Sequence, residues 1–235
     1  MLPIKFIRAP LESVAFPSMS KLNPNSLNYK NYYYNLIRLC SLVTMPIMTF
    51  LHISSENIIP IVLGNQWNEV IEIFAILCLG AIIQPVSSLR GLICLSSGNS
   101  KIYLNQGLIT ALIISITFIL SISYGIKILA WSYIIMTWVI FLPMNSYASK
   151  GTSINGIGII KACSTSVVCS FLSIGLYYYF EPLFSINDNI FMSLFMKFIL
   201  IVFIFCSSFL FSKENKRIVI SAYRYAHDII FRGSK

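Results

Sequence analysis

The sequence predicts an all-α integral membrane protein with about six transmembrane helices. Hydrophobic residues make up 57% of the 235 residues and charged residues only 11%. Soluble domains carry about 25% charged residues, so this chain has too little polar surface to cover a water-soluble core. The apolar residues also gather in charge-poor runs. In a bilayer such runs fold as helices, because an open sheet would leave backbone groups unpaired in lipid.

Charge and cysteine usage argue against two other kinds of protein. The net charge is +9, which can indicate nucleic-acid binding. Here the cations lie in a few loops and tails between apolar runs, as membrane orientation requires, so we expect no nucleic-acid partner. The six cysteines lie in apolar stretches without a C-x-x-C pair, and the two histidines are distant in sequence. We therefore expect no metal site and no cofactor.

The first 35 residues precede the membrane domain. Residues 1–35 mix polar, apolar and proline residues, and no long apolar core follows the first cations. They are therefore not a signal peptide. We interpret them as the cytoplasmic end of a helix that begins upstream of Met1, followed by an inner loop.

Six charge-poor runs form the predicted membrane domain, residues 36–212. A bilayer core of about 30 Å takes about 20 helical residues. The predicted spans are residues 36–55, 73–95, 102–126, 128–149, 162–180 and 189–212. Pro46, Pro85 and Pro143 lie inside the first, second and fourth spans, where they can kink a helix.

Residues 213–235 form a basic tail. Its apolar residues recur on one helical face, whereas Arg217 and Arg224 lie off that face; the apolar positions are Val219, Ala222, Tyr223, Ala226 and Ile230. This pattern predicts an amphipathic helix that lies on the inner leaflet. A helix that binds a protein partner is the alternative.

The loops alternate in charge and so predict an orientation. Cations lie in residues 1–38, in 90–101, in 150–161 and in the tail, whereas the loops at 56–72 and 181–188 carry acids and no cation. The short turn between the third and fourth spans, which carries only Lys127, is the exception. By the positive-inside rule, six spans then place both termini of this multi-pass protein in the cytoplasm. Tyrosines within residues 29–34 and 177–179 support these span ends, because tyrosine rings favour the boundary between membrane and water.

Five segments, taken in order, resemble segments of one family. They are "VAFPSMSKL" (14–22), "RLCSLVTMPIMTFL" (38–51), "IIPIVLGNQWNEV" (58–70), "LRGLICLSSGNSK" (89–101) and "PMNSYASKGTSI" (143–154). The shared features include a proline before a serine–basic pair, a glycine–tryptophan outer loop and a helix end rich in glycine. In order, spacing and span count, the chain resembles Wzx-type polysaccharide flippases of the MOP superfamily, most closely the colanic-acid and O-antigen exporters.

The resemblance implies a carrier and not an enzyme. Such flippases have two lobes of helices, and this chain corresponds to the C-terminal lobe. The implied function is translocation of lipid-linked oligosaccharide or polysaccharide repeat units across the bacterial inner membrane. The implied partners are an undecaprenyl-pyrophosphate-linked glycan, membrane lipids and a separately encoded N-terminal lobe. The alternative to such a split flippase is a truncated chain that lacks the N-terminal lobe.

Three cations are the candidate substrate-binding residues, because charges at membrane depth are costly and mark functional sites. Lys197 lies about 12 Å inside the sixth span and either faces a cavity or extends its amine to the headgroups. Arg90 lies near the cytoplasmic end of the second span and either reaches the inner headgroups or contacts the lipid-linked phosphate at a gate. Arg38 precedes the apolar run of the first span. We expect no catalytic residue and no metal ligand.

Neutral polar residues in the spans have a simpler explanation. Gln84, Asn105, Gln106 and Asn145 are able to bind a sugar, but hydrogen bonds between neighbouring helices are the favoured interpretation.

Two other functions fit parts of the sequence. A membrane enzyme of the same pathway, such as an O-antigen polymerase, needs a sizeable outer loop with acidic, basic or arginine groups, and the longest outer loop, about residues 54–72, has three acids and no cation. An inactive half-transporter remnant is the other alternative.

The six-span orientation predicts opposite exposure of two loops. In a variant without native cysteines, Asn68→Cys should react with a membrane-impermeant maleimide from outside intact cells. Ser100→Cys should react only after the membrane is opened. Labelling of both from the same side would reject this topology.

Overall fold

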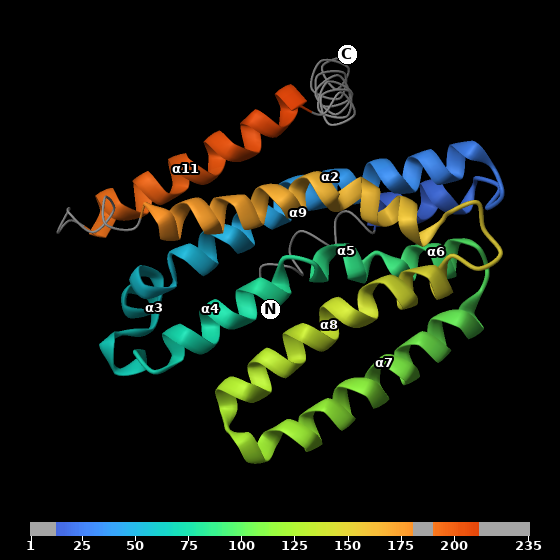
Figure 1. Ribbon diagram of the computed structural model, residues 1–235. Coiled ribbons are helices and arrows are strands. Elements are labelled where there is room, and N and C mark those ends of the chain that lie inside the picture. The colour runs from blue at the N-terminus through green and yellow to red at the C-terminus, as the bar shows by residue number, and fades with distance from the viewer. Residues whose placement is uncertain (1–12, 181–189, 212–235) are drawn as a thin grey trace.

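The computed structural model describes residues 13–180 and 190–211, and every regular element among them is a helix (Figure 1). The predicted all-α class is confirmed. Five helices are long and apolar enough to cross a membrane, and a bent helix pair makes a sixth candidate span. The predicted amphipathic tail, residues 213–235, lies outside the described residues.

The elements follow one another with short connections. After a helical stretch at residues 13–20, they are α2 (Leu27–Ile53), α3 (Ser55–Leu63), η1 (Asn65–Trp67), α4 (Val70–Ala81), α5 (Gln84–Ser88), α6 (Arg90–Ser96), α7 (Ser100–Ser121), η2 (Ile122–Tyr124), α8 (Ile126–Ala148), α9 (Gly156–Tyr179) and α11 (Ile190–Phe211). The long helices are packed in a row. α11 packs on α9 and α2, α2 also packs on the bent segment α4–α5–α6, and α8 and then α7 complete the row (Figure 1).

α2 begins earlier than the predicted first span. It starts at Leu27, where the Ser26 hydroxyl caps the helix by accepting the backbone N–H of Tyr29 at 3.2 Å. Residues 27–35, expected as an inner loop, are therefore helical. Tyr29 and Tyr33 are fully buried, so these two rings pack inside the bundle and do not form the boundary belt that the sequence suggested.

The second predicted span is bent in the structure. Turn residues at Ile82–Ile83 and at Leu89 divide it into α4, α5 and α6, and the axes before and after the first break differ by 51°. Pro85 lies in the first turn of α5. Proline is tolerated there, but it lacks a backbone N–H and crowds the preceding turn, so a straight helix cannot continue through it.

The turn between the third and fourth spans is centred on Gly125 and not on Lys127. Gly125 has φ +95°, a left-handed conformation that glycine adopts without a steric penalty. Lys127 lies in the first turn of α8 and forms an exposed ion pair with Glu72. Exposed pairs of this kind stabilise proteins only slightly.

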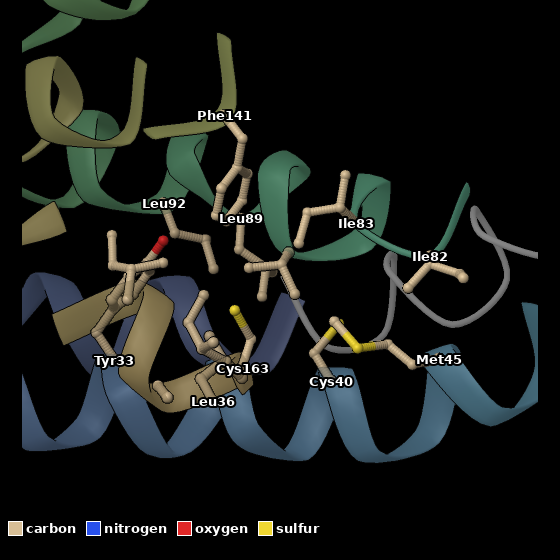
Figure 2. Close-up of a cluster of buried hydrophobic side chains, with 14 of the residues drawn as sticks. Tyr33, Leu36, Cys40, Met45, Ile82, Ile83, Leu89, Leu92, Phe141 and Cys163 are labelled. Carbon is tan, nitrogen blue, oxygen red and sulfur yellow. The ribbon is translucent and has the colours of Figure 1, made fainter. Parts of the chain in front are cut away.

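The core lies between α2 and the bent segment. Figure 2 shows side chains from α2, among them Cys40 and Met45, facing Ile83 and Leu89 of the bent segment. Phe141 of α8 and Cys163 of α9 close the same cluster. α2 therefore holds the segments on either side of it in one body.

The loop between α8 and α9 is fixed to the start of α2. The Ser153 hydroxyl donates to the backbone oxygens of Pro24 and Ser26. The Tyr34 hydroxyl donates to the Asn155 backbone oxygen at 3.2 Å and accepts the Asn155 N–H at 3.0 Å. A Cβ at Gly158 would lie 2.0 Å from that hydroxyl, so α9 approaches α2 this closely only because residue 158 has no side chain.

Gly158→Ala should therefore destabilise the protein. The added methyl overlaps the Tyr34 ring, and overpacking of this kind lowers the free energy of unfolding by about 1–3 kcal/mol. Gly175→Ala is the matched control on α9, because nothing lies within 4 Å of a Cβ there, and alanine is the better helix former. Thermal unfolding in nanodiscs should rank Gly158→Ala below the parent and Gly175→Ala at or above it. Equal unfolding temperatures for the two variants would contradict this packing.

Candidate functional site

A groove opens beside the bent segment. It lies between α5–α6 and α7, has a volume of about 710 Å³, and Tyr133 of α8 lines its wall. Its lining residues are Ser87, Ser88, Arg90, Gly91, Tyr103, Leu104, Gln106, Gly107, Leu108, Thr110, Ala111, Ile114 and Tyr133. In membrane proteins, broken helices commonly border substrate sites, because irregular backbone is tolerated where it lines a cavity.

Arg90 is the charged residue of this groove. Its Nε donates to the Ser87 backbone oxygen at 2.8 Å. Its Nη1 is buried and has no hydrogen-bond partner among the residues that the structure describes. A buried guanidinium nitrogen without an acceptor is costly, and in a membrane span such a group indicates a functional site. Arg90 therefore has donor capacity left for an anion.

Two further polar atoms around α6 lack partners. The Tyr33 hydroxyl on α2 is buried and unbonded, and Tyr33 interacts electrostatically with Arg90. Figure 2 shows Tyr33 reaching from α2 toward Leu92 of α6. Oδ1 of the fully buried Asn145 on α8 is also without a partner. Three buried polar atoms near α6, on Arg90, Tyr33 and Asn145, thus have no hydrogen-bond partner among the described residues.

Neutral polar residues hold the walls of the groove together. Gln84 Nε2 donates to the Tyr133 hydroxyl at 2.6 Å, which joins α5 to α8. Gln106 Nε2 donates to the Met144 backbone oxygen at 2.7 Å, which joins α7 to α8. These two glutamines join helices as expected. Asn105 is exposed on α7, and the Asn145 amide donates to Phe141 of its own helix.

Lys197 lies in a different place. It is only 4% exposed, its Nζ donates to Asn57 Oδ1 at 2.6 Å, and the amine lies 5.1 Å from the centre of the Tyr177 ring. Asn57 belongs to α3 and Tyr177 to the last turn of α9. Lys197 thus joins α11 to two other elements, and its amine does not extend to the surface.

Arg38 lies on the α9 side of α2. Its neighbours one turn away are Tyr34 and Ser41, whose hydroxyls bond to Asn155 and Ser166 next to or within α9. Residues three and four apart share a helix face, so Arg38 lies on that side. Its own Nη1 donates to Asn35 at 3.3 Å.

The structure does not bring the three predicted cations into one site. Lys197 lies beside α3, beyond the C-terminal end of α2, whereas Arg90 interacts with Tyr33 near the beginning of α2. From Tyr33 to Ile53 the helix rises about 30 Å. Arg90 and Lys197 therefore lie near different ends of α2 and cannot hold one phosphate together. Figure 1 shows α3 and α6, beside which they lie, far apart in the bundle.

A second cavity lies at the α3 end. It has a volume of about 650 Å³ and is lined by Ser55, Glu56, Pro60, Asn68, Ile71, Glu72, Ala75 and Tyr178. His52 is next to it, with Nδ1 2.8 Å from the Ala75 backbone oxygen. Within residues 13–180 and 190–211, no three His, Cys, Asp or Glu side chains are placed to hold a metal ion.

Sequence reasoning missed four residues around these sites. Asn57 is 140 positions from its partner Lys197, and no local pattern links them. Tyr103 and Tyr133, which line the groove, lie within apolar runs and look like ordinary packing residues. A signal was present only for Tyr33, because Tyr29 and Tyr33 are four apart and so share the helix face that turns to α6.

The first third of the chain is similar to known proteins. Residues 1–72 match a family described as polysaccharide biosynthesis protein. The chain is 25% identical over 75 residues to the lipopolysaccharide biosynthesis protein WzxC of Escherichia coli (strain K12), a match that covers 32% of this chain and 15% of that protein. No solved structure matches the chain. The resemblance to Wzx-type polysaccharide flippases is thus confirmed.

The contact between Lys197 and Asn57 predicts a measurable coupling. Asn57→Leu removes an acceptor from a buried ammonium group and should lower the free energy of unfolding by about 1–3 kcal/mol. Asn105→Leu, at an exposed position of α7, should change it little. With Lys197→Met as the second substitution, a double-mutant cycle should show that the two changes are not additive. Additive losses would contradict a direct interaction.

Proposed function

From this similarity we propose that the chain is part of a carrier that moves lipid-linked oligosaccharide or polysaccharide units across the bacterial inner membrane. The observation that carries the proposal is Arg90, whose buried Nη1 lacks a partner in a groove beside a bent span. The match to polysaccharide biosynthesis proteins supports the choice of substrate.

Arg90 suits the phosphate end of such a substrate. The proposed substrate is an undecaprenyl-pyrophosphate-linked glycan, in which the pyrophosphate carries the negative charge. Guanidinium groups bind phosphate oxygens through paired, charge-assisted hydrogen bonds. Nε of Arg90 already donates to Ser87 and Nη1 is buried, so a substrate phosphate would bind this guanidinium only after a rearrangement that exposes Nη1.

The charge distribution supports an orientation for this binding step. Lys101 and Lys150 lie near the α6 end of the bundle, and Glu56 and Glu72 lie at the α3 end. The positive-inside rule then places the α6 end, and with it Arg90, toward the cytoplasm, where lipid-linked units would be taken up. Both chain termini would lie on the cytoplasmic side.

The other two cations have different proposed roles. The Lys197 amine is engaged by Asn57 and the Tyr177 ring, which supports a role in joining α11 to the bundle at the outer end. Arg38 is partly exposed on the α9 side of α2. In the proposed transport cycle, Arg38 is a candidate to contact the substrate after Arg90 has bound it.

We propose that transport requires a second set of helices. The aligned segment covers 15% of the E. coli protein, and the groove between α5–α6 and α7 is open to the surface of this chain. Further helices, either of a longer chain or of a separately encoded N-terminal lobe, would cover this opening. Without them, the chain would be an inactive remnant. The polymerase alternative gains no support, because most of the loop at residues 54–72 is folded into α3 and η1.

Complementation tests this proposal. A bacterial strain without its polysaccharide flippase should regain surface polysaccharide when it expresses this chain together with an N-terminal lobe, and not with the chain alone. Failure with the lobe supplied would overturn the carrier proposal.

Charge variants in the same assay test Arg90. Arg90→Gln should reduce export at least tenfold, because the phosphate loses its donor, and Arg90→Lys should retain part of it. Lys101→Gln, which removes an exposed cation near the same end, should leave export unchanged. Full export by Arg90→Gln would exclude Arg90 from the site.

A further inference from the structure

We propose that α3 and η1 are seated in the outer leaflet, where the face formed by Ile58, Ile61 and Val62 contacts acyl chains and Trp67 lies at the headgroups. α3 thus separates lipid from the second cavity, which it lines. Only the assignment of this leaflet as the outer one rests on the proposed function. The two faces of α3, its depth beside the spans and its short connections support this position.

α3 has one apolar face that is exposed in the part of the chain that the structure describes, and another face that lines the cavity. Ile58, Ile61 and Val62 share one side of the helix, because residues three and four apart lie above one another. Ile61 is 51% exposed and Val62 70%. Glu56 and Pro60, which are four apart, lie on another side and line the cavity. Such a division into two faces is typical of a helix at a membrane interface.

The contacts of α3 place it beside the spans and below their ends. Asn57 on α3 accepts from Lys197 at 2.6 Å, and Lys197 lies about 10 Å along the helix from the beginning of α11. Pro60 lines the same cavity as Ala75, which lies about 8 Å from the beginning of α4. One leaflet contributes about 15 Å of hydrocarbon, so α3 lies at the depth of the acyl chains.

The connections to the neighbouring spans are too short to lift α3 out of the membrane. Only Ser54 separates α3 from the end of α2, and Asn68 and Glu69 separate η1 from the start of α4. Two residues span at most about 7 Å. Figure 1 shows α3 at the same end of the bundle as the start of α4. The exposed face of α3 therefore meets lipid and not bulk water.

Trp67 fits the boundary above α3. It is 46% exposed and lies in η1, between α3 and the start of α4. Tryptophan is enriched at membrane–water interfaces, because its ring is apolar and its N–H is polar. This places η1 at the headgroups and the first turn of α3 among the acyl chains.

The cavity beside α3 keeps two carboxylates out of lipid. Glu56 and Glu72 both line it, and Glu72 also pairs with Lys127. Charged groups at membrane depth face protein or a water-filled cavity and not lipid. A wall between the acyl chains and these carboxylates is therefore required, and α3 supplies it with its apolar face turned outward.

A helix of another protein is the competing occupant of the apolar face. Contacts between membrane helices favour small residues, because these let the two backbones approach closely. The exposed face of α3 carries Ile58, Ile61 and Val62, which are branched and bulky. Acyl chains adapt to such a surface without a close approach of backbones, so lipid is the occupant that this face fits.

Tryptophan fluorescence tests the position of α3 on the full chain in phosphatidylcholine nanodiscs. The starting variant replaces the three native tryptophans by Trp67→Phe, Trp131→Phe and Trp138→Phe, so that one introduced tryptophan reports alone. Val62→Trp in this background should be quenched at least twice as much by lipid brominated on its acyl chains as by acrylamide in the water. Glu56→Trp, on the cavity face of the same helix, should show the opposite order.

Three results would overturn the lipid contact. Stronger quenching of Val62→Trp by acrylamide than by brominated lipid would place the face in water. Protection of Val62→Trp from both quenchers would mean that protein covers the face. Equal quenching of the two variants by brominated lipid would contradict the separation of lipid from the cavity. Unfolding temperatures within the error of the parent would show that both variants fold.

Trp67 itself tests the level of η1. When only Trp131→Phe and Trp138→Phe are present, bromine near the headgroup end of the acyl chain should quench Trp67 more than bromine near the bilayer centre. The reverse order, or no quenching by either lipid, would overturn the headgroup position. This variant changes no residue of α3 or η1, so it keeps the position testable if the α3 variants do not fold.

The quenching result is independent of the complementation assay. If export is restored and acrylamide is the stronger quencher of Val62→Trp, the carrier proposal stands and the lipid contact fails. If brominated lipid is the stronger quencher and export is not restored, the lipid contact stands without the carrier. Labelling of Asn68→Cys only from the inside would reverse the leaflet and leave the contact with lipid in place.

Discussion

The burial of α2 is the constraint on which the rest of the structure depends. In its most apolar stretch 56% of the residues are buried, against 6% for the span formed by α7 and η2. One face of α2 binds α6 through Tyr29, whose hydroxyl reaches Ile93 and Ser96, and a neighbouring face binds α9 through Tyr34 and Ser41. The wall of the groove that carries Arg90 is fixed by these contacts. The opposite wall, α7, is held mainly by α8.

The polar residues of the spans fall into two groups. Most donate to another helix or to their own backbone, as Gln84, Gln106 and Lys197 do, and so replace the hydrogen bonds that lipid cannot offer. Arg90, Tyr33 and Asn145 differ, because each keeps a buried polar atom without a partner among the described residues. Buried polar groups are almost always hydrogen-bonded in proteins, so these unpaired atoms indicate a ligand.

The sequence predicted the helical spans well, because charge-poor runs and the bilayer thickness determine them almost alone. It did not predict which proline breaks a helix. Pro46 and Pro143 lie inside continuous helices, whereas Pro85 lies beside the break. All three prolines lie within charge-poor runs, so composition alone does not distinguish them. The break at Pro85 is seen only in the folded bundle, where α4 and α5 pack on α2 and α8. The sequence identified Arg90 as a candidate because a charge inside a membrane span is energetically costly. It did not predict the groove or the pairing of Lys197 with Asn57, because both arise from contacts between segments that are distant in sequence.

The pairing of α2 with α9 also has a consequence for biogenesis. The hydroxyls of Ser41 and Ser166 meet across 125 positions of sequence. At about 5–20 residues per second of synthesis, the α9 face of α2 waits about 6–25 s for its partner after it has been made. During that interval Ser41 and the charged Arg38 have no helix beside them. Assembly of the bundle around α2 is therefore completed late in translation.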